Sequence, residues 1–217
     1  TKGIEYFSTH GKEKNKYKLF GELALVHDIQ GNIDSSLFYY DKQANYFQDI
    51  EDFESLAAVF QNKGVAYYYQ GNLEKAVKEF IAAKEVFEKL NDSITVFELN
   101  ANIGVMFNEL SQFDKALLYF NEAQTFAEKH GDDRQKGRIY SFIGSFYETI
   151  DSLQLALKFQ LKSLEYHQKI DSQRDIAINF HNIGTLYETK GDLHKAVNYY
   201  TKAIDLKKEL GFKLSLA

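Results

Sequence analysis

The chain repeats itself at a fixed step of 40 residues. Four tripeptides ending in glycine mark this step: Asn62-Lys63-Gly64, Asn102-Ile103-Gly104, Phe142-Ile143-Gly144 and Asn182-Ile183-Gly184. A constant period of roughly 20–50 residues is typical of stacked supersecondary units that share no single closed core. We therefore expect one repeat array over residues 1–217. Its units are 22–61, 62–101, 102–141, 142–181 and 182–217, with residues 1–21 as the second half of a preceding unit.

Each unit contains two helical patterns separated by turn residues. Apolar residues recur at three- and four-residue spacing, as in Leu73, Ala76, Val77 and Phe80, which indicates one apolar helix face. The patterns are interrupted at Gln70-Gly71-Asn72, Asn91-Asp92-Ser93, His130-Gly131-Asp132 and Asp171-Ser172. Since the chain has no proline, no helix interior is broken. The sequence predicts an all-α fold of ten helices of about 16–18 residues, paired antiparallel, plus a fragment at each end.

Small residues mark the packing positions of the repeat. A glycine inside a helix costs roughly 1 kcal/mol against alanine, so its recurrence predicts close contact where a Cβ would clash. The recurring small residues are Gly64, Gly104, Gly144 and Gly184, and Ala76, Ala116, Ala156 and Ala196. Unit 142–181 departs most from the pattern, because Gln160 and Ser163 occupy positions that are apolar in the other units.

These residues resemble a tetratricopeptide repeat. The pattern in one unit reads Gly64, Tyr67, Gly71, Ala76, Phe80 and Ala83, and the last reads Gly184, Tyr187, Gly191, Ala196, Tyr200 and Ala203. Two departures are the missing closing proline and a period of 40 where about 34 is usual. The resemblance implies a right-handed α-solenoid of stacked helix pairs, with the first helices lining a concave groove. It also implies that the groove binds a partner protein.

If the resemblance holds, one stripe of each first helix faces this groove. Candidate binding residues on or beside it are Gln61, Asn62, Tyr68, Asn102, Asn108, Arg134, Arg138, Ser141, Ser145, Arg174, His181 and Asn182. The shared asparagines Asn62, Asn102 and Asn182 could clamp a peptide backbone, because a side-chain amide both donates and accepts hydrogen bonds. Alternatively, they bond to a neighbouring helix or to water. Phe142 interrupts this asparagine series in the fourth unit.

The chain's three arginines all map to the expected groove. Arg134 and Arg174 occupy the same position in adjacent units, and Arg138 lies one turn after Arg134. The planar guanidinium suits carboxylates, which predicts a partner that is acidic or has a free carboxylate. The alternative is local pairing with nearby aspartates: Asp132, Asp133, Asp171 and Asp175.

Other function classes lack a sequence signature. The formal charge of −5 argues against direct nucleic-acid binding, and no apolar run approaches the roughly 20 residues that span a bilayer. There are no cysteines, and the six histidines have no metal-ligand spacing. No phosphate-binding glycine loop or nucleophile elbow is present. We expect no enzyme activity, no cofactor and no metal.

Three functions remain open at this point. The favoured one is a protein–protein interaction scaffold, expected in the cytoplasm. The second is a sensory module of a larger bacterial signalling protein, such as a histidine kinase or a transcription regulator, since the repeat is interrupted at both ends and the chain reads as a segment of a longer protein. The third is a spacer that self-associates through its cut ends, where Leu214 and Leu216 lie.

Overall fold

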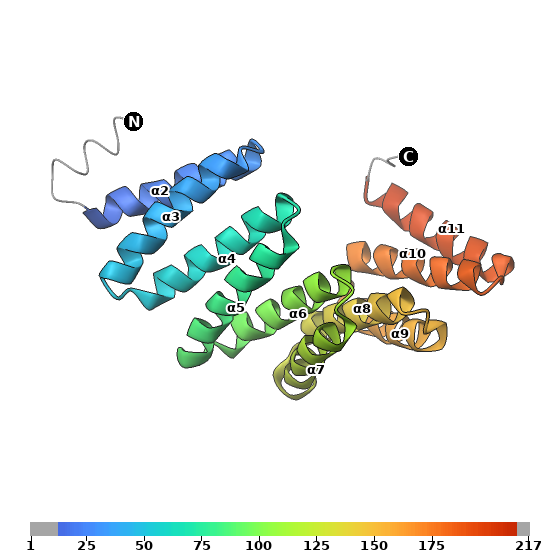
Figure 1. The fold of residues 1–217 in the computed structure, drawn as a ribbon. Coiled ribbons are helices and arrows are strands. Elements are labelled where there is room, and N and C mark those ends of the chain that lie inside the picture. Colours follow the sequence, from blue (N-terminus) through green and yellow to red (C-terminus); the bar gives the residue numbers. More distant parts are fainter. Residues whose placement is uncertain (1–12, 212–217) are drawn as a thin grey trace. The chain divides into compact units, whose positions relative to one another are not determined.

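A computed structural model describes residues 13–211, and throughout this range the regular structure is helical. In chain order the helices are α2 (Glu13–Ile29), α3 (Ile33–Asp49), α4 (Phe53–Tyr69), α5 (Leu73–Lys89), α6 (Ser93–Glu109), α7 (Phe113–His130), α8 (Asp133–Thr149), α9 (Leu153–Lys169), α10 (Gln173–Thr189) and α11 (Leu193–Glu209) (Figure 1). The predicted all-α fold with ten helices is confirmed for this range. The fragments expected at either end lie outside the described residues.

Helices pack as antiparallel pairs within two compact units, Thr1–Met106 and Phe107–Ala217. In the first unit α2 packs on α3 and α4 on α5, while α3 also contacts α4. In the second unit α8 packs on α9 and α10 on α11, and the contacts of α9 with α10 and of α7 with α8 continue the stack. The first helices of successive pairs begin at residues 13, 53, 93, 133 and 173, so the 40-residue step of the sequence is also the step of the helices.

The turns follow a step of half that length. A residue with positive φ follows a helix at Gly31, Glu51, Gly71, Asn91, Ser111, Asp151, Asp171, Gly191 and Gly211. Each such residue ends its helix in the left-handed conformation, which lets backbone N–H groups cap the last carbonyls. After α4, for example, Gly71 N–H donates to Tyr68 O and Asn72 N–H to Tyr67 O, both at 2.9 Å. The backbone therefore repeats every 20 residues, and the side chains every 40.

Glycines in the first helix of a pair make room for a side chain of the second. A Cβ at Gly64 would lie 2.9 Å from the Phe80 ring, and one at Gly184 would lie 2.7 Å from the Tyr200 ring. The clash predicted from the recurring glycines is thus confirmed at these positions. The partner alanines of the second helices are fully or almost fully buried, which allows the same close contact from the other side.

A charged residue occupies one packing position of the first unit. Lys63 lies where the other tripeptides have isoleucine, and its Nζ is 2.9 Å from Asp41 Oδ1 on α3 and 3.0 Å from Glu79 Oε1 on α5. Burial alone would lower the pKa of Lys63, but the two ion pairs outweigh it and the net shift is upward. Lys63 therefore links three helices while remaining charged.

Candidate functional site

The candidate binding residues lie on the first helices of their pairs, α4, α6, α8 and α10, at spacings that place them on one face of each helix. We call the face that carries Gln61, Tyr68, Asn108, Arg134, Arg138, Ser141, Ser145, Arg174 and His181 the first-helix stripe; Asn62, Asn102 and Asn182 lie beside it, and Glu148 and Glu188 continue it. On α4 it includes Gln61, which is half-buried, and Tyr68, which is 39% exposed. The Tyr68 ring lies edge-on to the Tyr69 ring at 5.9 Å.

The three shared asparagines are half-buried beside the stripe. Among residues 13–211, no hydrogen-bond partner is present for the side-chain amides of Asn62, Asn102 and Asn182. A bond to a neighbouring helix, one of the two alternatives from the sequence, is therefore absent in this range. The three amides keep their donors and acceptors for water or a ligand.

Asn108 differs from these asparagines because it links two helices. Its Nδ2 donates to Thr149 Oγ1 on α8 at 3.2 Å. Its Oδ1 is buried and has no hydrogen-bond partner among the described residues. This amide oxygen is an acceptor that the fold leaves unused.

Two of the three arginines are exposed at the starts of their helices. Arg134 lies in the first turn of α8 and Arg174 in the first turn of α10. No carboxylate within residues 13–211 forms an ion pair with either. A cation at a helix N-terminus opposes the helix dipole, so neither arginine is explained by helix stability.

The aspartates near these arginines make other contacts. Asp132 accepts from the Gln135 backbone N–H at 2.8 Å and so caps α8. Asp175 accepts from the Ser172 hydroxyl at 2.6 Å, and Asp171 accepts from the Gln173 side chain. These contacts replace the local pairing considered from the sequence.

Arg138 is half-buried and lies over an aromatic ring. Its guanidinium carbon is 5.7 Å from the centroid of Phe142, the residue that interrupts the asparagine series. A guanidinium at this distance is attracted to the ring face. At the position where three other units have an asparagine amide, Phe142 therefore provides an aromatic ring that attracts the Arg138 guanidinium.

Carboxylates occupy the other end of the stripe. Glu148 and Glu188 share one position near the ends of α8 and α10, and burial raises the pKa of Glu148. Glu188 Oε2 accepts from the Tyr200 hydroxyl at 2.5 Å. Burial and this hydrogen bond raise the pKa of Tyr200. Along α8 and α10 the stripe thus runs from arginine at the helix start to glutamate at the helix end.

Two serines of the stripe accept hydrogen bonds from a buried glutamine. Gln160 Nε2 lies 3.2 Å from the Ser141 carbonyl oxygen and 3.4 Å from Ser145 Oγ, and donates to both. Gln160 is fully buried, and a Cβ at Gly144 would lie 2.9 Å from it. The glycine that accommodates an aromatic ring in other pairs here accommodates an amide.

Gln160 belongs to a buried polar network between α8, α9 and α10. Asn179 Nδ2 donates to Gln160 Oε1 and Ser163 Oγ, both at 3.0 Å, and Ser163 Oγ donates to the Gly137 carbonyl at 2.7 Å. Asn179 Oδ1 lies 2.7 Å from His167 Nδ1. An amide oxygen can only accept, so His167 carries its proton on Nδ1.

This network includes residues that the sequence reading missed. Gln160 and Ser163 stood out as polar exceptions, whereas Asn179 and His167 did not. Asn179 replaces Val59, Leu99 and Ile139 of the other units. A Cβ at Gly137 would lie 2.5 Å from the His167 ring. At the 40-residue step Asn179 is polar where the other units are apolar, whereas His167 aligns with apolar residues but also with Lys207. This comparison marks Asn179 as an exception but does not show which side chains it contacts.

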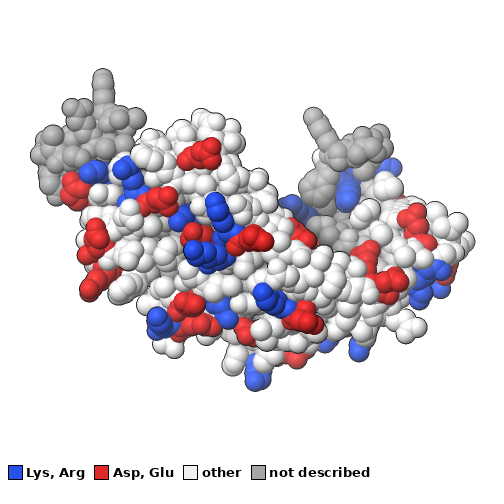
Figure 2. Space-filling view, in the orientation of Figure 1, with Lys and Arg blue, Asp and Glu red and all other residues white. Residues whose placement is uncertain are grey.

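Near the middle of α10, the exposed His181 lies beside an aromatic residue of the second helix. Its ring centroid is 5.5 Å from that of Tyr200. On the face that Figure 2 shows, lysine and arginine side chains are interspersed with aspartate and glutamate side chains. No three His, Cys, Asp or Glu side chains gather as a metal site within residues 13–211. Over the same range, no helix combines the length and apolar character that a bilayer crossing demands.

Comparisons with solved structures find the same architecture. BtubC (BKLC) from P. vanneervenii superposes with a TM-score of 0.81 at 19% identity, over 100% of this chain and 90% of that chain. The Rap conjugation gene regulator of plasmid pLS20, in complex with the Phr* peptide, gives 0.74 at 19% identity, over 94% and 57%. A STAND protein with a tetratricopeptide repeat sensor from Pyrococcus horikoshii gives 0.81 at 18% identity, over 91% and 31%.

A search of the curated proteins found no match. A family model for the tetratricopeptide repeat matches residues 55–129 and 135–209, which together make up more than half of the chain. These segments contain almost all of helices α4 to α11, the recurring glycine positions and most of the first-helix stripe. The chain belongs to the tetratricopeptide repeat family.

Proposed function

We propose that this protein is an interaction scaffold that binds an extended segment of a partner protein along the first-helix stripe. The observation that carries the proposal is the pair Arg134 and Arg174, which are exposed and without an ion pair in the described range. Three of the four neighbouring aspartates, Asp132, Asp171 and Asp175, accept hydrogen bonds from other residues. Two unpaired guanidinium groups at equivalent positions suit a ligand with repeated carboxylates or a free C-terminal carboxylate.

The other polar groups of the stripe fit the same ligand. The half-buried amide of Asn182, in the same compact unit as the two arginines, can pair with a peptide backbone without reading its side chains. Glu148 and Glu188, at the opposite helix ends, favour a basic or hydrogen-bond-donating group on that side of the ligand. The pLS20 regulator, which shares the fold, was solved with a bound peptide, and this agrees with the proposal.

The test starts from peptides selected on the chain from a random phage-displayed library. We expect the selected peptides to be enriched in Asp and Glu. Titration calorimetry with synthetic copies should show about tenfold weaker binding for Arg134→Glu and for Arg174→Glu, or about 1.4 kcal/mol each. Both variants place an acidic residue in the first turn of a helix, which favours folding, so a loss of affinity would report binding.

The matched control is Lys158→Glu, the same charge change at an exposed site on α9. Equal weakening by this variant would show that only net charge matters and would contradict the proposal. Unchanged affinity in both Asn102→Ala and Asn182→Ala would remove the asparagines from the binding site. A sensory module of a larger signalling protein would use the same stripe, and the sequence flanking residues 1–217 would distinguish it from a free scaffold.

A further inference from the structure

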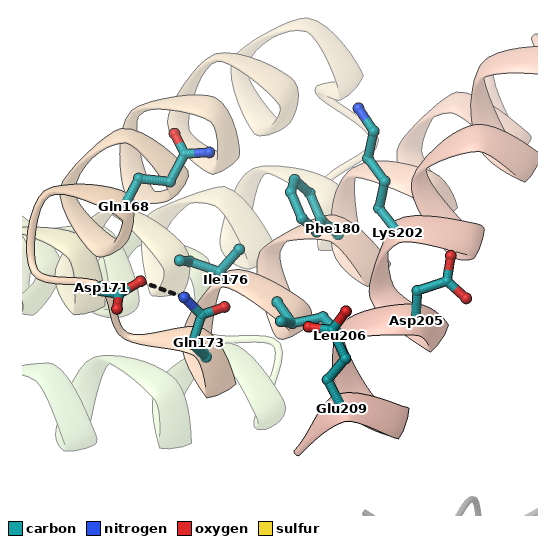
Figure 3. Close-up of a pocket in the computed structure, with 9 residues that line it drawn as sticks. All are labelled: Gln168, Asp171, Gln173, Ile176, Phe180, Lys202, Asp205, Leu206 and Glu209. Carbon is teal, nitrogen blue, oxygen red and sulfur yellow. Dashed lines mark hydrogen bonds between the residues drawn. The ribbon is translucent and has the colours of Figure 1, made fainter. Parts of the chain in front are cut away.

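A second candidate site lies on a different face from the first-helix stripe. It is a pocket of about 500 Å³ between the α9–α10 turn, the first half of α10 and the second half of α11 (Figure 3). Its lining consists of Gln168, Asp171, Gln173, Ile176, Phe180, Lys202, Asp205, Leu206 and Glu209. The α10 residues of the pocket, Gln173, Ile176 and Phe180, are offset around the helix from the stripe residues Arg174 and His181.

The preceding helix pair shows which side chains occupy the equivalent place one repeat upstream. Forty residues upstream of Phe180 and Leu206 are Tyr140 and Tyr166. Their rings stack with centroids 5.6 Å apart and an interplanar angle of 24°. The Tyr166 ring also lies 4.4 Å from Lys169 Nζ. In that pair the ring of Tyr166 occupies the space that Leu206 leaves open.

The aromatic surface of this pair is more exposed than its upstream equivalent, and α11 is the last helix of the described residues, whereas α10 packs on the preceding pair. Tyr140 is 1% exposed under its neighbouring ring, whereas Phe180 is only half-buried. Lys202 Nζ remains over the Phe180 ring at 5.7 Å, as Lys162 Nζ lies over Tyr140 at 4.0 Å. The pocket therefore keeps the stacking surface and its lysine but lacks the second ring.

The charge at the rim is also different. Upstream, Lys136 and Lys169 flank the ring, and the equivalent residues at the pocket are Ile176 and Glu209. Asp171 replaces Gly131 in the same comparison. The lining of the pocket thus carries three carboxylates, those of Asp171, Asp205 and Glu209, and one lysine, Lys202. Such a rim attracts cations.

We propose that this pocket binds an aromatic side chain of a partner protein that is flanked by lysine or arginine. The ring stacks on Phe180 between Ile176 and Leu206, in the place that Tyr166 fills one repeat upstream. The flanking cations pair with Asp171, Asp205 and Glu209. This site binds a basic aromatic segment, whereas the stripe binds an acidic one, so a single partner or two partners can occupy both.

The probe is N-acetyl-Lys-Tyr-Lys-amide, titrated to millimolar concentration into methyl-labelled chain while the NMR signals of Ile176 and Leu206 are followed. We expect saturable shifts of both signals. N-acetyl-Glu-Tyr-Glu-amide should bind about tenfold more weakly, since two attractive charge contacts become repulsive. N-acetyl-Lys-Leu-Lys-amide should also bind more weakly, because it lacks the ring.

The sharpest variant is Leu206→Tyr, which restores the upstream residue and fills the pocket from within. It should abolish the shift of Ile176 on peptide addition while the chain stays folded. The matched control is Ile204→Tyr, on α11 but outside the pocket lining, which should bind as the parent does. Arg134→Glu should also leave this binding unchanged, which separates this site from the stripe.

Three results would overturn the proposal: no saturable shift at millimolar peptide, unchanged binding by Leu206→Tyr, or equal binding of the Lys-Tyr-Lys and Glu-Tyr-Glu peptides. Deletion of residues 212–217 provides a further check. If that deletion alone moves the Ile176 signal to a position that added peptide no longer changes, the occupant is the chain's own end and not a partner.

Discussion

Residues with positive φ occur at the helix ends of this chain whether or not they are glycine. Glu51 has φ of 56° and Gly71 has φ of 79°, at equivalent places after α3 and α4. A side chain with a Cβ is strained in this region by roughly 1–2 kcal/mol, and glycine is not. The non-glycine residues at five of these turns therefore lower the stability of the array.

Replacing Glu51 with glycine should remove this strain. We expect Glu51→Gly to raise the free energy of unfolding by about 1 kcal/mol, measured by urea denaturation followed by circular dichroism. Gly71→Ala should lower the free energy of unfolding by a similar amount. No heavy atom lies within 4 Å of the added Cβ, so a steric clash would not contribute to this loss. A decrease in stability for Glu51→Gly would mean that the glutamate side chain contributes more than its backbone costs.

At the scale of helices, the sequence predicted most boundaries because polar turn residues interrupt the apolar patterns. The interruption predicted at Asn91-Asp92-Ser93 is confirmed as a helix start, since Asp92 Oδ1 accepts from the Thr95 backbone N–H at 3.0 Å. The buried network of α8, α9 and α10 could not be predicted in the same way. Asn179 or His167 considered alone is compatible with a solvated face, and only their contact with Gln160 and Ser163 makes burial favourable. The role of the first-helix stripe remains a prediction, because side-chain positions alone do not identify a ligand.

A double-mutant cycle between Gln160 and Asn179 tests the network. Asn179→Leu should cost about 2–3 kcal/mol of unfolding free energy, because it leaves polar atoms of Gln160 and His167 buried without partners. Gln160→Phe copies Phe80, which already fits against an equivalent glycine. The double variant should lose at least about 1 kcal/mol less than the sum of the single losses.

The control for this cycle is Gln160→Phe combined with Glu51→Gly, which lie in different compact units. These two changes should add within about 0.5 kcal/mol. If the losses of unfolding free energy of the Gln160 and Asn179 variants also added, the hydrogen bond between these residues would not couple the helices.

At the scale of the whole chain, two periods are superimposed. The turns recur every 20 residues, but first and second helices differ in their packing faces, so the side chains recur only every 40. First helices present a small residue where second helices present a large one, as with Gly64 and Phe80. A change in chain length is therefore tolerated only if it preserves the longer period.

Two deletions separate the periods. Removing residues 53–92 joins Asp52 to Ser93 and places an equivalent aspartate before α6, so we expect a folded chain with unchanged helicity per residue. Removing residues 53–72 keeps the turn spacing but puts a second helix where a first helix belongs. This variant should lose helicity per residue and bind a hydrophobic dye, as measured by circular dichroism and dye fluorescence. Equal folding of both variants would mean that turn spacing alone determines the stack.

The end of α7 shows how the 40-residue spacing between helix starts is preserved. This helix has 18 residues where its neighbours have 17, and Gly131 follows it in an extended conformation with φ of −75° and ψ of 149°. Even so, α8 begins 40 residues after α6, because the connecting turn is shorter by the residue that the helix gained. Here the start of α8 is fixed by the capping box of Asp132 and Gln135, while the end of α7 absorbs the change in length. Over evolution, single-residue insertions should survive near the ends of helices and be eliminated near their starts.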